Sequence, residues 1–315
     1  MVKSLKSQKI HESVLVNEVL EAFELFRPLK KVTKKKIIDA TVGTGGHTLG
    51  LVNYGADVLG IDVNSEMLAV AEERLKKALR AKDPSGPVAY LGSFGLVSGN
   101  FKDIDKLAKD NGFEEVDGIL FDLGVTNVVL KSENLGFSFS NPDAELDMRM
   151  DPKNQAVKGS DLINILREDQ LVELFSKILK RAEAEKIAYE IVSFRKTRKI
   201  ETVGDFLEAI KFVKGKPSLH LGTLPFLALR IAVNSELENL KEALPKAFDV
   251  LKSGGRIVTI SFHSGEDAIV KKFFEESQRA GLAKTDNKKP IIASAEELRT
   301  NSKARSAKLR ILEKI

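Results

Sequence analysis

A glycine-rich segment, KIIDATVGTGGH at residues 36–47, carries the first residues that could do chemistry. Its apolar part, Ile37–Ala40, is typical of a strand, and it runs into a turn that contains Gly43, Gly45 and Gly46. Glycine accepts positive φ and lets a ligand approach the backbone closely. The turn therefore predicts a ligand site, although an ordinary strand–turn–helix connection would show the same pattern.

An acid follows the next predicted strand, because Asp62 comes directly after Val58–Ile61. In a strand–turn–helix–strand unit, an acid at this place binds the ribose hydroxyls of an adenosine ligand. The glycine spacing is G-x-G-G, whereas dinucleotide sites use G-x-G-x-x-G to hold a pyrophosphate at the helix N-terminus. S-adenosylmethionine (SAM) has no phosphate, so the pattern favours SAM as the cofactor.

Composition narrows the class of protein. The chain has 315 residues and is 43% hydrophobic, which suffices for one large domain or for one domain with an insertion. No apolar run is long enough for a transmembrane helix, and residues 1–14 lack the apolar core of a secretion signal, so we expect a cytoplasmic protein. Four histidines, no cysteine and no HExxH motif argue against a metal site. The net charge of +5 permits an anionic partner.

Strand and helix patterns alternate along the first part of the chain. The predicted elements are a helix at Val16–Phe26, a helix at Asn64–Leu79, a third strand at either Val88–Leu91 or Leu96–Ser98, a helix at Ile104–Lys109 and a buried strand at Val116–Phe121. Strands that alternate with helices imply an α/β fold with a parallel sheet.

The alternation stops in the middle of the chain. From Ser160 to Lys214 the pattern is helical and no strand interrupts it, which indicates a helical insertion. A further helical stretch, Leu224–Leu251, is predicted to break near Pro245. A Gly-Gly turn at 254–255 should then lead into a strand at Arg256–Phe262.

Several short motifs occur in a fixed order along nearly the whole chain. They are His11–Leu15 (HESVL), Gly45–His47 (GGH), Asp122–Thr126 (DLGVT), Leu135–Phe139 (LGFSF), Leu146–Asp151 (LDMRMD), Ala228–Ile231 (ALRI), Val233–Leu237 (VNSEL), Ser261–Ser264 (SFHS) and Asn301–Arg310 (NSKARSAKLR). The ordered set, rather than any single motif, strongly resembles the bacterial small-subunit (16S) ribosomal RNA cytosine-N4 methyltransferase family, often called methyltransferase H.

The resemblance implies a class I SAM-dependent methyltransferase fold, which is α/β and Rossmann-like with a mostly parallel seven-stranded sheet. It implies a methyltransferase domain at 1–140 and 216–315, with an inserted helical RNA-recognition domain at 141–215. The implied activity is N4-methylation of one cytidine in the decoding region of 16S rRNA. The implied partner is this rRNA or the assembled small ribosomal subunit.

The resemblance and the turn pattern together imply a set of cofactor contacts. The set is Gly43, Gly45, Gly46, His47, Asp62, Phe101 and Asp122. Phe101 offers a flat apolar face for adenine, although a phenylalanine after a strand most often packs in the core. His47 begins a helix and could equally cap it or pack.

The methyl transfer itself points to Asp122. Cytosine's exocyclic amine is a poor nucleophile, so transfer needs close alignment and acceptors for the amine hydrogens. The amino-methyltransferase signature Asp/Asn-Pro-Pro-aromatic is absent, and Asp122 begins the motif that stands in its place. We hypothesise that Asp122 and His263 are the catalytic pair, with His263 shaping the base pocket and Asn127 and Arg149 as weaker substrate-binding candidates. Alternatively, Asp122 only fixes its own loop through backbone N–H groups.

A basic run in the insertion is a further candidate for substrate binding. Its cations are Arg195, Lys196, Arg198 and Lys199. Near the active site of a nucleic-acid enzyme such a run contacts phosphates, whereas elsewhere it is a solvated helix face.

The chain departs from the family pattern at several positions, and several polar groups are lost. The departures include Val129, Leu135, Leu224, Leu227, Gly265 and Ala268. The departures leave two alternative functions open. One is a non-catalytic RNA-binding or ribosome-assembly factor that keeps the SAM fold. The other is a small-molecule N-methyltransferase, which the large basic insertion disfavours.

Overall fold

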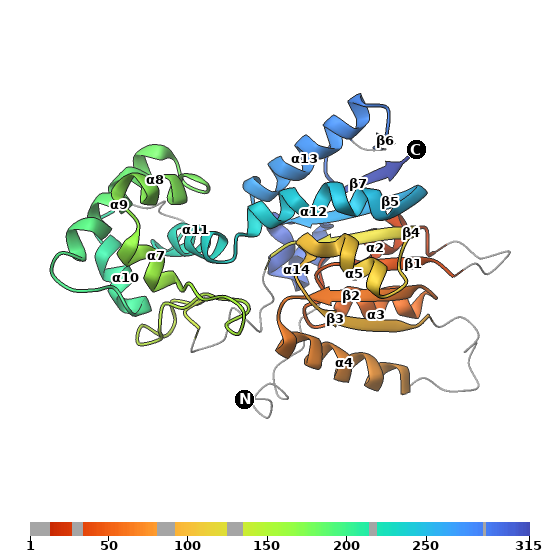
Figure 1. The fold of residues 1–315 in the computed structure, drawn as a ribbon, viewed down its shortest axis with the longest axis horizontal. Helices are drawn as coiled ribbons and strands as arrows, with labels where there is room; N and C mark the ends of the chain where they lie inside the picture. Colours follow the sequence, from red (N-terminus) through yellow and green to blue (C-terminus); the bar gives the residue numbers. More distant parts are fainter. Residues whose placement is uncertain (1–12, 27–33, 81–91, 125–134, 214–218, 286–287) are drawn as a thin grey trace. The chain divides into compact units, whose positions relative to one another are not determined.

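Two compact units make up the chain (Figure 1). Unit 1 comprises Met1–Thr126 and Glu238–Ile315, and unit 2 comprises Asn127–Leu237. The predicted insertion, 141–215, lies inside unit 2, which extends beyond both of its predicted bounds. The computed structural model describes residues 13–26, 34–80, 92–124, 135–213, 219–285 and 288–315.

Unit 1 is built on one seven-stranded sheet with the strand order β3-β2-β1-β4-β5-β7-β6. The strands are β1 (Lys36–Asp39), β2 (Asp57–Asp62), β3 (Phe94–Ser98), β4 (Val116–Asp122), β5 (Leu251–Ser261), β6 (Ala283–Lys284) and β7 (Lys308–Lys314). The strands β1 to β5 run parallel to one another, and β7 is antiparallel to both β5 and β6. This order and direction confirm the class I methyltransferase fold.

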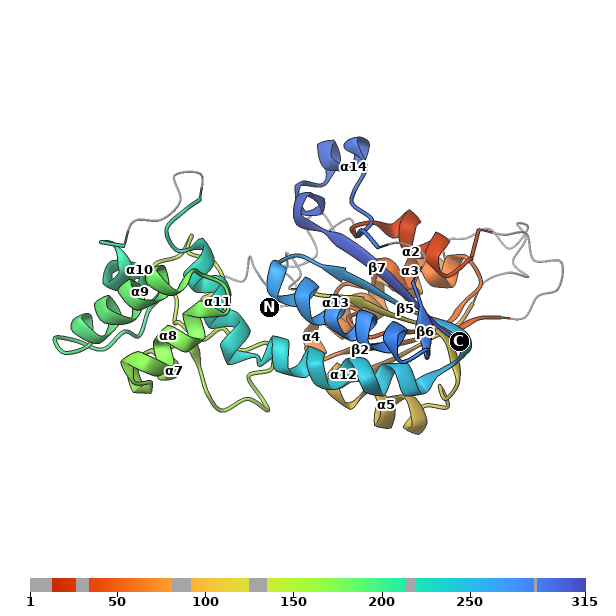
Figure 2. The same cartoon turned by 90° about the horizontal axis from the view of Figure 1, so that it is seen from above.

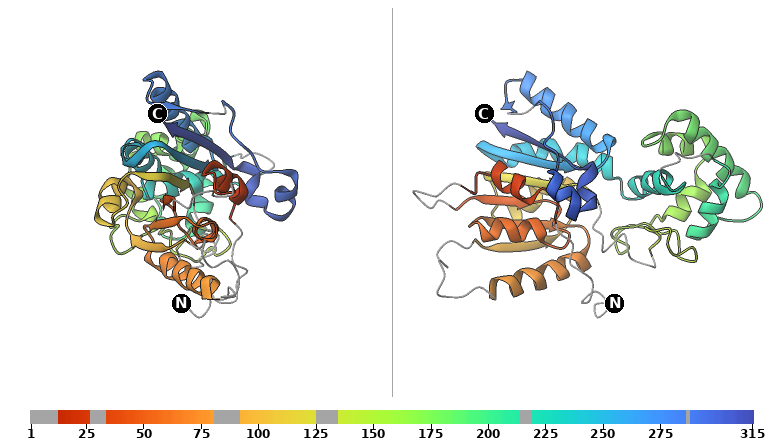
Figure 3. Two further views of the ribbon diagram at one scale, coloured as in Figure 1. Left: turned by 90° about the vertical axis from the view of Figure 1, so that its right-hand side faces the viewer. Right: turned by 180° about the vertical axis from the view of Figure 1, so that it is seen from behind.

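Helices cover both faces of this sheet. The helical elements are α2 (Val16–Ala22), α3 (Gly46–Asn53), α4 (Ser65–Arg80), η2 (Phe101–Asp103), α5 (Ile104–Asp110), α12 (Glu236–Val250), α13 (Ser264–Arg279), α14 (Ala295–Thr300) and η3 (Ser302–Ser306). Figure 2 shows α5 and α12 on one side and α2 and α3 on the other, and Figure 3 shows α2 and α3 again from behind.

Side chains alternate between two cores because successive residues of a strand point to opposite faces. Ile38, Ile119 and Phe121 pack with α5, α12 and α13. Ile37 and Leu120 pack instead with α2 and α3. Parallel strands buried on both faces read as continuous apolar runs, which explains why β1 and β4 were predictable from sequence.

Two predictions about the chain's second half are wrong. The helical stretch is interrupted at Asn234–Ser235, where Ser235 has φ of 50°, and α12 continues through Pro245. Buried residues on both sides of Pro245 pack on the sheet and hold the helix together. The strand β5 begins at Leu251 rather than at Arg256, because the glycines at 254–255 lie in an irregularity of the β4–β5 register.

Of the two candidates for the third strand, the second is present as β3. The first, Val88–Leu91, lies outside the described residues. The short strand β6 and the helix α14 were not predicted. A two-residue strand and a six-residue helix are too short to show a periodicity.

Unit 2 is helical, as predicted. Its helices are α7 (Gly159–Ile165), α8 (Glu168–Ser176), α9 (Arg181–Phe194), α10 (Val203–Ile210) and α11 (Thr223–Val233). The core of the unit contains a row of aromatic rings, with centroid distances of 6.4 Å for Phe175–Phe206 and 5.2 Å for Phe206–Phe226. No helix among the described residues is long and apolar enough to cross a membrane.

Replacing the proline inside α12 should stabilise the protein. Pro245 is exposed and lacks the N–H that would bond the carbonyl of Lys241. We expect Pro245→Ala to raise the free energy of unfolding by about 1–2 kcal/mol, since the restored bond outweighs the freedom gained by the unfolded chain. Urea unfolding followed by circular dichroism measures the change, with Lys241→Ala as an exposed control. An unchanged or lower free energy of unfolding for Pro245→Ala would contradict this account of α12.

Candidate functional site

Three acids lie at the carboxyl ends of neighbouring strands in unit 1. Asp39 ends β1, Asp62 ends β2 and Asp122 ends β4. The register pairs Asp39 with Gly60 on one side and Leu120 on the other, so the three strand ends lie side by side. Ligands of open parallel sheets bind at this edge, which makes it the candidate site.

The glycine turn has the backbone that its residues permit. Gly43 and Gly45 have φ of 53° and 77°, which glycine adopts without steric cost. The Gly43 N–H donates to Asp62 Oδ2 at 2.8 Å and so joins the turn to the end of β2. A Cβ atom at Gly46 would lie 1.9 Å from Ser13 Oγ. Any larger residue at Gly46 would therefore displace Ser13.

Within the described part of the chain, Asp62 has fewer hydrogen-bond donors around it than its carboxylate can use. Its Oδ1 accepts from the Asn64 N–H at 2.8 Å, and its Oδ2 accepts from Gly43. Burial raises the pKa of Asp62 to about 6, against the lowering effect of these two bonds. Each carboxylate oxygen accepts about two hydrogen bonds, so both keep capacity for a ligand. The two hydroxyls of a ribose would supply such donors.

His47 is buried and joins two separate parts of unit 1. Its Nε2 donates to the carbonyl of Val14 at 2.9 Å, and its Nδ1 lies 3.3 Å from Asp122 Oδ2. Burial lowers the pKa of His47, but the carboxylates of Asp122 and Asp39 raise it, and the net shift is upward. A ring with both nitrogens protonated satisfies the carbonyl and the carboxylate together.

Asp39 was missed by the sequence analysis. Its Oδ2 accepts from Thr48 Oγ1 at 2.6 Å, and its Oδ1 accepts from the Thr41 N–H at 3.2 Å. Thr41 Oγ1 accepts in turn from the Asp122 N–H at 2.7 Å, which ties the ends of β1 and β4 together. The available signal was an acid at the end of an apolar strand, directly before the glycine turn.

The Asp122 carboxylate has one oxygen in use and one free. Oδ2 faces His47, while Oδ1 is buried and has no hydrogen-bond partner among the described residues. Buried polar atoms normally have a hydrogen-bond partner. An unpartnered oxygen at the sheet edge where ligands bind is therefore a candidate for contact with a ligand. The alternative role, in which Asp122 fixes its own loop, involves residues 125–134, which lie outside the described residues.

Phe101 lies partly in the core and partly at the surface. Its ring meets the ring of Phe121 edge-on, with centroids 5.8 Å apart and planes at 88°. The Gly99 N–H donates to the Asp62 carbonyl at 3.0 Å, which keeps this segment beside the end of β2. The contact with Phe121 explains why Phe101 is partly buried. The contact of Phe101 with adenine stays a prediction.

His263 caps α13 at the same sheet edge. Its Nδ1 accepts from the Glu266 N–H at 3.4 Å, and Glu266 Oε2 accepts from the N–H groups of Phe262 and His263 at 2.9 and 3.3 Å. Its Nε2 lies 3.2 Å from Glu266 Oε1, an ion-pair distance without hydrogen-bond geometry. A Cβ at Gly124 would lie 3.3 Å from the Phe262 ring, so the loops after β4 and β5 are neighbours.

Arg149 belongs to unit 2 and its guanidinium bonds within its own loop. It donates to Asp147 at 2.6 and 2.8 Å and to the Gln155 carbonyl at 2.6 Å. Burial raises the pKa of Asp147, but the hydrogen bonds to Arg149 lower it by more than burial raises it, so the net shift is downward. Asn234 braces the loop by bonding the backbone on both sides of Arg149 at 2.8 Å. Asn127 lies outside the described residues.

The basic run at the end of α9 divides into two kinds of residue. Arg195 donates to the Ile163 carbonyl at 2.7 Å, and Arg198 pairs with Asp205 and Glu208 at 2.9 and 2.6 Å. Lys196 and Lys199 are exposed and have no ion pair with a described residue. The two arginines thus help to hold unit 2 together, and the two lysines are the cations available to a partner.

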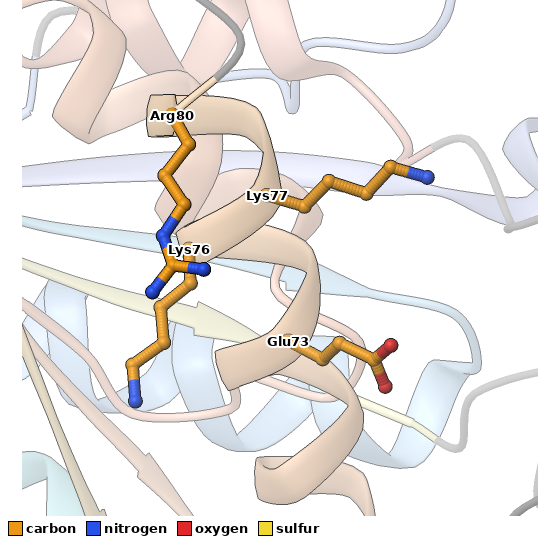
Figure 4. A pocket seen from close by; sticks show the side chains of 4 residues that line it. All are labelled: Glu73, Lys76, Lys77 and Arg80. Atoms are coloured by element: carbon orange, nitrogen blue, oxygen red, sulfur yellow. The ribbon is translucent and has the colours of Figure 1, made fainter.

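A second cationic feature lies on the last turns of α4, where Glu73, Lys76, Lys77 and Arg80 line a surface pocket (Figure 4). The helix starts just after the end of β2 and runs back along the sheet, so this pocket is near the opposite edge from Asp122. Among the described residues, no group of three or more histidine, aspartate or glutamate side chains could hold a metal ion.

Comparison with known proteins agrees with this arrangement. The model of the MraW methylase family matches residues 8–315. A ribosomal RNA small subunit methyltransferase H from Methylacidiphilum infernorum is 42% identical over 88% of each chain. Another from Persephonella marina is 38% identical over 97% of this chain and 99% of its own. The chain therefore belongs to the MraW methylase family and is a SAM-dependent methyltransferase.

Proposed function

We propose that this enzyme transfers a methyl group from SAM to the N4 amine of a cytidine in the decoding region of 16S rRNA, in the cytoplasm. The observation that carries the proposal is the edge of unit 1 where Asp62, Asp122 and the glycine turn meet. The names of the relatives, ribosomal RNA small subunit methyltransferase H, support the substrate.

The residues at this edge fit the methyl donor. The unused acceptor capacity of Asp62 suits the ribose hydroxyls. Gly45 and Gly46 would meet the ligand through their backbone atoms, because Ala71 and Ser13 lie where a Cβ atom would project. Phe101 offers the exposed side of its ring to the adenine. Asp39, Asp62 and Asp122 gather at this edge around a single histidine, and such acidic surroundings suit the positive charge of SAM. When bound, SAM supplies an electrophilic methyl group on a positively charged sulfur.

Asp122 is the residue that we assign to the target amine. Its orphan Oδ1 can accept a hydrogen from the amine as positive charge grows on the nitrogen. The contact with His47 on Oδ2 fixes the rotation of the carboxylate, so this acceptor needs no reorganisation during the reaction. His263, held by its capping bonds at the same edge, would shape the base pocket without taking a proton.

Unit 2 is the part of the chain that we assign to RNA recognition. Lys196 and Lys199 are its proposed phosphate contacts, because their charges are not already committed to a described acid. Arg195, Arg198 and Arg149 would act indirectly, since each is bonded within unit 2. Asn127 keeps its predicted role in substrate binding as part of this proposal.

The direct test is transfer of labelled methyl groups from SAM to small ribosomal subunits, followed by digestion of the 16S rRNA to nucleosides. We expect the label in N4-methylcytidine. Label in a different nucleoside would refute the target that we propose. Absence of label, from a protein that binds the subunit, would favour the non-catalytic assembly factor.

Asp62 should control the pH dependence of SAM binding. We expect Asp62→Ala to weaken binding by about 1.5–3 kcal/mol, the range for a hydrogen bond to a charged group. Because the pKa of Asp62 is raised to about 6 and ribose hydroxyls favour the ionised carboxylate, wild-type affinity should rise as pH increases through that value. Asp62→Asn should lack this rise, and Asp57→Asn, at the other end of β2, should keep it. Calorimetry from pH 5 to 8 that shows the same pH dependence for Asp62→Asn and wild type would exclude Asp62.

The charge on Asp122 should matter for the chemical step. Asp122→Asn keeps the shape of the side chain and removes the charge, so the single-turnover rate at saturating SAM should fall about 10- to 100-fold. Asp117→Asn, at the opposite end of β4, is the matched control. A folded Asp122→Asn enzyme that methylates at the wild-type single-turnover rate would remove Asp122 from the mechanism.

The two free lysines of unit 2 should contribute to the salt dependence of RNA binding. Phosphate contacts release counterions, so replacing Lys196 and Lys199 together by Gln should reduce the slope of log affinity against log salt by about 1–2. The double variant Lys76→Gln and Lys77→Gln on α4 is the control, and its slope should stay the same (Figure 4). Filter binding to 16S rRNA at several salt concentrations measures both. Equal slopes for the wild type and both double variants would show that Lys196 and Lys199 are solvated and do not contact phosphates.

A further inference from the structure

Three consecutive residues near the start of the described chain touch two different parts of unit 1, the start of α3 and the helix α14. Ser13 packs against Gly46, so closely that a Cβ there would lie 1.9 Å from its Oγ. The Val14 carbonyl accepts from His47. The Leu15 N–H donates to Glu297 Oε1 at 2.8 Å, across 282 positions of sequence.

The backbone at Leu15 is in an unusual conformation. Its φ of 56° and ψ of 36° lie in the left-handed region, which is sterically unfavourable for a residue other than glycine. The side chain is fully buried among residues of α2, α3 and β1. Such a conformation persists where surrounding contacts over-determine it, and the Glu297 carboxylate is one of those contacts.

The segment that carries Glu297 is itself anchored. Ser294 Oγ accepts from the Glu297 N–H at 3.2 Å and so caps α14. Ala293 and Ala304, on either side of this helix, are buried in the same core as Leu15. The Glu297 carboxylate thus reaches from a fixed helix to the N-terminal segment instead of capping its own helix.

The chain of contacts ends at the methyl-donor site. A shift of the Val14 carbonyl would remove the partner of His47 Nε2, and the other nitrogen of that ring faces Asp122 at 3.3 Å. Displacing Ser13 would also loosen the packing against Gly46. The Glu297 carboxylate accepts from Leu15, which is not one of the predicted cofactor-binding residues.

We propose that Glu297 is a positioning residue for the methyl-donor site. Glu297 holds residues 13–15 in place, and these residues in turn orient His47 against Asp122. This inference rests on the proposed SAM site. It also gives a role to Ser13–Leu15, the described part of the HESVL motif, to which the proposed function assigns no role.

Calorimetry with SAM on matched variants tests the proposal. Glu297→Ala removes the acceptor and should raise the Kd for SAM about tenfold. Glu297→Gln keeps an oxygen that can accept from Leu15 and should stay within about threefold of wild type. Glu296→Ala, an exposed acid on the same helix, should leave the Kd unchanged. Where Glu297→Ala does not fold, Glu297→Met keeps the length of the side chain and serves in its place.

Two further measurements separate positioning from general stability. Ser294→Ala removes the cap of α14 without touching the Glu297 carboxylate, so it should lower Tm while the Kd for SAM stays near wild type. The ring ¹⁵N signals of His47, recorded without SAM, should move in Glu297→Ala and stay in Ser294→Ala. Equal loss of SAM affinity in both variants, or unmoved His47 signals in Glu297→Ala, would overturn the proposal. Moved His47 signals in Glu297→Ala together with an unchanged Kd for SAM would instead refute the proposed donor site alone.

Discussion

The contact that the candidate site depends on is the buried imidazole of His47, between the Val14 carbonyl and the Asp122 carboxylate. A carbonyl can only accept and a carboxylate is best met by a donor, so the arrangement is satisfied when both ring nitrogens carry protons. A buried cation is costly unless it is paired. The carboxylates of Asp122 and Asp39 supply that pairing, and the same cation offsets part of their mutual repulsion.

This arrangement links the fold to the proposed chemistry. The parallel sheet brings the ends of β1, β2 and β4 to one edge, and the acids that end those strands then lie close together. One of them, Asp122, has an oxygen without a described partner, and another, Asp62, holds its proton up to a pH of about 6. Unpartnered acceptors and raised pKa values are typical of functional sites, where polar groups are positioned to bind a ligand and not to stabilise the fold.

Much of this could be predicted from local sequence. The apolar strands, the glycine turn and Asp62 are each recognisable from a few neighbouring residues. The resemblance carried by the ordered motifs then predicted the complete seven-stranded sheet. The remainder depends on contacts between distant segments. Pro245 stays helical because α12 is packed on the sheet. The bond from Leu15 to Glu297 spans 282 positions and leaves no local pattern. The division of the basic run into bonded arginines and free lysines likewise needs the positions of Ile163, Asp205 and Glu208.

The most direct test of the account is the protonation state of His47 itself. The ring nitrogens can be followed by ¹⁵N NMR between pH 5 and 9, with the signals of His47 assigned by their absence in His47→Asn. We expect the His47 ring to titrate with a midpoint above the ordinary value of 6.5, so that both nitrogens are protonated at that pH. A midpoint below 6.5, or a neutral ring with a bare Nδ1 facing Asp122 at that pH, would contradict it.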